Sequence, residues 1–191
     1  MKKIITVVLM LASMQVGAAG LGIVVSDKYA GVDYLIEQST NFSGASLELG
    51  FTYNEHKDII GHFSVLAEGD IVGQEEKFNF GVGMKIGALY LKNYKKAPTF
   101  DQSWFAGIQL RFAYVATMDT PIQLYADVIA SPNVFSFNTL ERYSETAVGF
   151  KVQFLPSATF SFGYKNVTVL PVKSKSIRLY EGPFISFGAT F

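Results

Sequence analysis

Apolar and polar residues alternate with a period of two along most of the chain beyond residue 20. In the last stretch, 182–191, Ile185, Phe187 and Phe191 fall on one side of an extended chain, and Ser186 and Gly188 fall on the other. This period is typical of a β-strand with one apolar face. The same alternation predicts further strands over 21–26, 30–37, 45–54, 59–68, 78–90, 104–114, 122–128, 145–154 and 159–165.

Polar segments separate these expected strands, at 27–28, 38–44, 55–58, 69–76, 92–103, 117–121, 131–142, 155–157 and 171–181. No helical periodicity of useful length and no domain boundary interrupts the pattern beyond residue 20. We therefore predict an all-β fold of eight to ten antiparallel strands. Ten is preferred, because an even count returns both termini to the same side of a barrel.

Alternation alone does not show which face is enclosed, since a soluble lipid carrier puts its apolar face inward and a membrane barrel puts it outward. The polar faces are rich in small residues, which suit a narrow lumen: Gly50, Gly81, Gly83, Gly87, Gly107, Gly149, Gly163 and Gly188. The apolar faces carry aromatic residues near strand ends, as interfacial girdles do: Tyr53, Phe78, Tyr90, Trp104, Tyr114, Phe154, Phe160 and Phe191. The pattern favours an antiparallel transmembrane up-and-down β-barrel, with a soluble periplasmic lipid carrier as the alternative.

The start of the chain is typical of a secretory signal peptide. Lys2 and Lys3 precede an apolar run over 4–14, and Gly17, Ala18 and Ala19 supply a small-residue cleavage site. The apolar run is too short to be retained as a spanning helix. We expect a cleaved signal over 1–19 and a barrel domain over 20–191, exported to the cell outer membrane of a Gram-negative bacterium.

Composition excludes several functions. The formal net charge is zero and no basic field indicates binding to nucleic acid. The absence of cysteine excludes a disulfide framework or a thiolate metal site. No phosphate loop, zinc signature or calcium loop is present, so the sequence indicates no cofactor and no metal.

Catalytic candidates are few, and we expect no enzyme. His62 and Ser64 lie two apart on one strand, a spacing that resembles the outer-membrane lipid A deacylases. Alternation turns both toward the lumen, and Val65 replaces the asparagine expected beside them, so a lipid-modifying hydrolase is only a minor alternative. Asp101 and Glu141 are loop acids with no assigned role.

Charged residues recur on the predicted inner faces. A charge in a narrow lumen is costly unless it is paired. We therefore expect a lumen polar network that includes Glu48, Lys85, Arg111, Asp127, Glu145, Lys151 and Lys165, with Asp33, Glu37 and Glu68 also facing inward. Such side chains would fill the lumen and allow little steady conductance. The function expected is structural or one of surface interaction, and a narrow porin for small solutes is the alternative.

Several segments resemble the YfaZ-like outer-membrane proteins. They are a Ser-Pro loop start at 131–132, a Tyr-Ser-Glu strand at 143–145, a Gly-Tyr strand at 163–164 and a Gly-Pro at 182–183 before the final aromatic strand, with a further match over 43–55. The resemblance implies a small outer-membrane barrel and brings no catalytic motif. The final strand also resembles the closing strand of bacterial outer-membrane barrels, in which a terminal aromatic such as Phe191 is an assembly signal.

These resemblances also imply partners and a topology. The partners are the assembly machinery and outer-membrane lipid, including lipopolysaccharide. With Phe191 on the periplasmic side, the segments 92–103, 131–142 and 171–181 lie outside the cell. Their basic residues, Lys92, Lys95, Lys96, Lys173, Lys175 and Arg178, would then face lipid phosphates or solvent.

Overall fold

The computed structural model describes residues 18–40, 43–71, 78–91, 102–116, 120–172 and 175–191. Their elements are β1 (Ala18–Ser26), β2 (Tyr29–Thr40), β3 (Ser43–Asn54), β4 (Ile59–Asp70), β5 (Phe78–Tyr90), β6 (Ser103–Ala116), β7 (Ile122–Ser131), the 3₁₀ helix η1 (Asn133–Phe135), β8 (Ser136–Phe137), β9 (Leu140–Leu155), β10 (Ala158–Pro171) and β11 (Ile177–Thr190).

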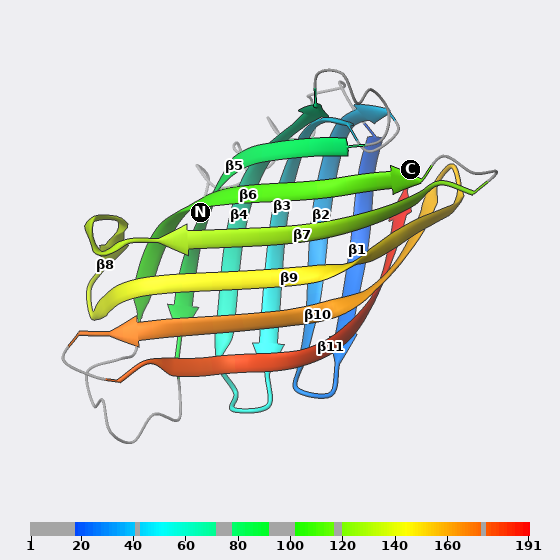
Figure 1. The fold of residues 1–191 in the computed structure, drawn as a ribbon. Coiled ribbons are helices and arrows are strands. Elements are labelled where there is room, and N and C mark those ends of the chain that lie inside the picture. The colour runs from blue at the N-terminus through cyan, green and yellow to red at the C-terminus, as the bar shows by residue number, and fades with distance from the viewer. Residues whose placement is uncertain (1–17, 41–42, 72–77, 92–101, 117–119, 173–174) are drawn as a thin grey trace, which may run out of the picture.

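The strands close into one barrel (Figure 1). Each long strand pairs antiparallel with its neighbours in the chain, β7 pairs with β9, and β1 pairs with β11 to close the sheet. The two-residue β8 adds only a short pairing to β6. Within the described residues the barrel therefore has ten strands, which confirms the predicted all-β, antiparallel, up-and-down architecture and the preferred count.

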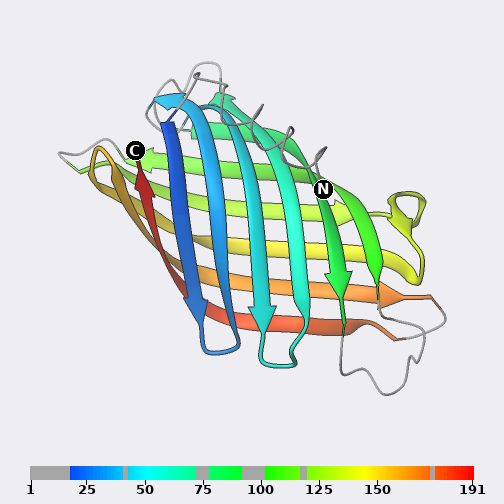
Figure 2. The ribbon, with the colours of Figure 1, turned by 180° about the vertical axis from the view of Figure 1, so that it is seen from behind.

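The two rims of the barrel differ. One rim carries the start of β1 and the end of β11, where the Phe191 N–H donates to the Ala19 carbonyl at 2.8 Å. We call this rim the terminal end. The other rim, the loop end, carries the connections at 27–28, 55–58 and 132–139, together with the end of β10 and the start of β11 (Figure 2).

Several strands extend further than the alternation predicts. The expected turn at 38–44 shrinks because β2 and β3 continue to Thr40 and from Ser43. At the loop end, β10 runs to Pro171 and β11 begins at Ile177, so most of the expected loop at 171–181 is strand. Backbone pairing continues there, but the inward side chains are large and apolar instead of small. The contrast between the two faces, which predicts a strand from the sequence, is then lost.

The apolar face of the barrel points outward. Val32, Phe51 and Ile108 are 52%, 60% and 52% exposed, and exposure alternates in the same sense along all or part of each strand except the short β8. Aromatic rings pair along this surface, as Phe78 and Tyr114 do with centroids 5.0 Å apart. An inward apolar face, which the soluble lipid carrier requires, is not the arrangement found in the described strands. Nor does that part of the chain hold a helix with the length and apolar character to cross a bilayer.

Candidate functional site: a lumen closed at one end

An apolar cluster fills the lumen at the loop end. Its members are inward residues near the loop-end terminus of their strands: Tyr29, Ile60, Leu89, Leu91, Phe105, Ile129, Leu140, Tyr143, Val167, Val169, Leu179, Tyr180 and Phe184. We call this cluster the plug. Side chains so completely enclosed exclude water, so the plug closes this end of the barrel.

Stacked aromatic rings hold the plug together. Phe105 and Tyr143 stack with centroids 3.7 Å apart, and Tyr29 and Tyr180 stack at 4.2 Å. A bulge in β11 opposite β10 places Leu179 out of register, so that both it and Tyr180 are buried. Each stacked pair joins strands that are separated by one other strand, since β6 and β9 flank β7 and β2 and β11 flank β1.

Below the plug lies a buried charge cluster centred on Glu145. Its carboxylate accepts from Lys85 at 2.9 Å and from Lys165 at 2.7 Å, and it also accepts from the Tyr143 hydroxyl at 2.6 Å. Because β5, β9 and β10 supply these side chains, the ion pairs span the interior. Full pairing of this kind is what a carboxylate buried beside an apolar layer requires.

A second charge cluster lies on the β6–β7 wall. Arg111 donates to both oxygens of Asp127, from Nε at 2.6 Å and from Nη2 at 2.8 Å, and its Nη1 donates to Glu68 at 3.1 Å. The guanidinium also lies 5.5 Å from the centre of the Tyr125 ring. Such a bidentate pair is geometrically specific and fixes the arginine in the lumen.

A third group joins β2, β3 and β4. His62 Nε2 lies 2.7 Å from Glu48 Oε1 and 3.9 Å from Asp33 Oδ1. Asp33, Gly50 and His62 are register partners across the three strands. A Cβ on Gly50 would collide with the Asp33 carboxylate and the His62 ring, so the glycine makes the space in which these groups meet.

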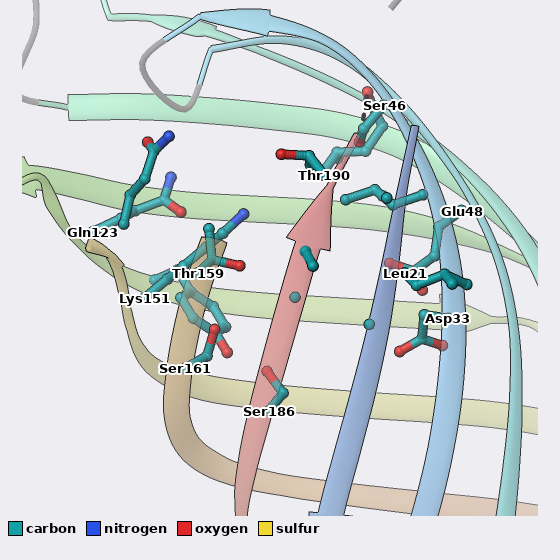
Figure 3. Close-up of a pocket in the computed structure, with 18 of the residues that line it drawn as sticks. Leu21, Asp33, Ser46, Glu48, Gln123, Lys151, Thr159, Ser161, Ser186 and Thr190 are labelled. Atoms are coloured by element: carbon teal, nitrogen blue, oxygen red, sulfur yellow. Dashed lines mark hydrogen bonds between the residues drawn. The ribbon is translucent and has the colours of Figure 1, made fainter. Parts of the chain in front are cut away.

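A polar cavity of about 320 Å³ occupies the lumen on the terminal side of these charges (Figure 3). Its walls include Asp33, Glu48, Lys151 and Ser161, and it reaches the rim at Thr190. The buried side-chain atoms with no hydrogen-bond partner include two on this wall, Gln109 Oε1 and Gln123 Nε2. The cavity is therefore a polar cup whose far end is closed by charges and then by the plug.

The residues singled out from the sequence have distinct places. Glu48, Lys85, Arg111, Asp127, Glu145 and Lys165 face inward and form ion pairs with lumen partners, and Lys151 lines the cavity. Phe191 follows the last strand and is exposed. The side chain of Glu37, together with Lys92, Lys95, Lys96, Asp101 and Lys173, lies outside the described residues.

The structure gives a partner to two further residues considered from the sequence. Arg178, expected to face lipid phosphates or solvent, has a 62% exposed side chain and forms an ion pair with Glu181 at the loop end. His62, considered first as a partner of Ser64, is instead hydrogen-bonded through Nε2 to Glu48.

The sequence interpretation missed the plug. Its signal is nonetheless present, because the inward-facing positions near the loop end of each strand, such as Ile60, Leu89, Phe105 and Ile129, hold large apolar residues.

A scan against protein-family models found no match to this chain, and a search of curated protein sequences found no relative.

Proposed function

We propose that the protein is a small integral outer-membrane β-barrel with a blocked, polar-lined lumen, acting in a structural or surface-interaction role and not as an open pore. The single observation that carries this proposal is the plug. Its members come from strands around the barrel and form one cluster of buried side chains, so a continuous water path would have to pass through that cluster.

Dimensions and surface chemistry support the membrane location. The 13 residues of β5 span about 43 Å at about 3.3 Å each, and a tilt of about 40° leaves about 33 Å along the barrel axis. This length exceeds the apolar band of about 25 Å that such barrels present to lipid. The outward residues of the strand, among them Val82, Met84 and Ile86, are about half exposed, as a lipid-facing wall requires.

The proposal includes the orientation and partners inferred from the sequence. The terminal end faces the periplasm, the loop end faces outward, and the YfaZ-like outer-membrane proteins are the family to which we assign the chain. The resemblance of the final strand to closing strands supports entry through the outer-membrane assembly machinery. The outward apolar wall supports contact with membrane lipid, including lipopolysaccharide.

Two measurements test this function. The protein should be recovered with outer membranes and should migrate differently on gels before and after boiling, as a closed barrel does. Recovery from the soluble periplasm after osmotic shock would refute the membrane location. In planar bilayers the intact protein should show no steady conductance, whereas large and stable ion-selective channels would refute the blocked lumen.

A narrow porin remains the second candidate, since the cavity already occupies the terminal half of the lumen. It requires the plug to move, so conductance should then depend on the plug residues. The same bilayer recordings distinguish the two functions.

A further inference from the structure

Asp33, Glu48 and His62 bring three potential metal ligands together on the inner wall of the barrel. The candidate donor atoms of these residues lie within 4.8 Å of one another. We propose that this group binds a divalent transition-metal ion with the ligand preferences of Zn²⁺. The inference does not depend on the membrane location of the barrel.

The convergence has a clear structural cause. Strands β2 and β4 are separated by β3, so their backbones lie about 9.6 Å apart. Across that separation, His62 Nε2 and Asp33 Oδ1 still come within 3.9 Å of each other. They meet because Gly50 stands between them on β3 without a side chain. Glu48, two residues earlier on the same strand, completes the set from the same face.

The distances suit a bound ion. Donors about 2.1 Å from a tetrahedral zinc lie about 3.4 Å from one another. The His62 to Glu48 distance of 2.7 Å and the His62 to Asp33 distance of 3.9 Å lie on either side of that value. Small side-chain rotations therefore place all three donors around one ion.

The donor chemistry selects the class of metal. An imidazole nitrogen with two carboxylates is a borderline ligand set that suits Zn²⁺, whereas Mg²⁺ and Ca²⁺ prefer oxygen alone. Two carboxylates with a neutral imidazole also match the charge of a divalent ion. With three protein ligands, a fourth position is left for water or a solute.

Charge and access support the same conclusion from a separate observation. The nearby cations Lys85 and Lys165 are both bound to Glu145, so the two carboxylates of this group share one imidazole. Negative charge in a confined lumen is costly, and a divalent cation offsets it. Asp33 and Glu48 line the cavity, which gives an ion a path from the terminal end (Figure 3).

Sequence motifs do not reveal this site, because one ligand comes from each of three strands and no short spacing links them. The bound ion would join β2, β3 and β4 and would raise the stability of the folded barrel in proportion to its occupancy. Metal binding and thermal stability should therefore change together.

The test uses the full barrel chain, without a histidine tag, folded in detergent and freed of metal with EDTA. Titration calorimetry with ZnCl₂ should show one ion per chain, and unfolding should shift to higher temperature with Zn²⁺ but not with Mg²⁺ or Ca²⁺. Co²⁺ should give the visible absorption of a four-coordinate nitrogen and oxygen site. Absence of both saturable Zn²⁺ binding and this spectrum would overturn the proposal.

Variants locate the site. His62→Gln and Asp33→Asn should each weaken Zn²⁺ binding at least about tenfold, while His56→Gln, in the exposed turn after β3, should leave it unchanged. Heat-modifiable migration on gels identifies the variants that fold. If His62→Gln does not fold, Asp33→Asn decides. Wild-type affinity in a folded His62→Gln or Asp33→Asn barrel would refute the assignment.

Discussion

Glu145→Gln should destabilise the barrel strongly, because Glu145 is the carboxylate with which both Lys85 and Lys165 form ion pairs. The substitution keeps the side-chain volume and an oxygen that Tyr143 can still donate to, so it changes the charge and little else. Lys85 and Lys165 would then remain as neighbouring positive charges, with Lys85 only 5% exposed. Removing one partner of a buried ion pair costs about 3–5 kcal/mol.

We expect the free energy of unfolding to fall by about 3 kcal/mol or more, which is a factor of more than about 100 in the folding equilibrium. Urea or guanidinium unfolding of the barrel in lipid vesicles measures this loss. The single tryptophan, Trp104, is on the exposed outer surface and reports on the transfer between lipid and water. The midpoint should decrease while the denaturant slope stays constant.

A control variant and a double-mutant cycle distinguish the loss of the ion pairs from a general destabilisation of the fold. Glu55→Gln removes a carboxylate in an exposed turn and should cost under about 1 kcal/mol. The double variant Lys85→Met with Glu145→Gln should lose less free energy of unfolding than the sum of the two single variants. The reason is that Lys85→Met removes one of the two positive charges that Glu145→Gln leaves without a carboxylate partner. A loss below about 1 kcal/mol for Glu145→Gln, or simple additivity in the cycle, would refute the view that Glu145 neutralises both lysines.

Three further predictions follow from the plug, the glycine face and the last residue. Replacing Phe105 and Tyr143 together by alanine should open the loop end and produce measurable conductance in planar bilayers, and continued silence would show that other groups close the lumen. Gly163→Ala should lower the midpoint of unfolding, because its Cβ would collide with the Val148 carbonyl oxygen, whereas Gly69→Ala, with open space around it, should not; equal midpoints would contradict this packing. Phe191→Ala, which keeps the backbone N–H that donates to Ala19, should reduce assembly in cells, measured as the heat-modifiable fraction, yet change the stability of the refolded barrel by less than about 1 kcal/mol, because the side chain is 76% exposed; unimpaired assembly would remove its role as a signal.

Alternation was sufficient to predict the strands and which residues share a face, because both are local properties of a chain with period two. The outward direction of the apolar face was inferred separately, from the small residues on the polar faces and the aromatic residues near strand ends. One charge pair was also within reach of the sequence. Arg111 and Asp127 are register partners across the β6–β7 hairpin, so their contact follows from the turn between those strands. Pairs of this kind depend on few residues and on a short loop.

Other contacts could not be predicted, since they depend on how the closed sheet curves and staggers. Lys85 and Glu145 are 60 residues apart and lie on strands that do not pair with each other. Their meeting requires the diameter and shear of the whole barrel, which strand patterns do not specify. The same limit applies to Phe105 and Tyr143, whose rings stack although β6 and β9 are separated by β7 and do not pair.

The order of the layers along the lumen explains why the charge groups differ in how fully they are paired. Glu145 lies next to the apolar side chains of the plug, and within the described residues it accepts from Lys85, Lys165 and Tyr143. Asp33 and Glu48 line the cavity, where water lowers the cost of unbalanced charge, and they share His62. A carboxylate surplus is thus tolerated only where the lumen is wet, and a cation from the terminal end can reach the surplus there. In the proposed function, the plug both blocks the barrel and keeps one side dry. Complete pairing is then required beside the plug, and the proposed cation binding is confined to the open side.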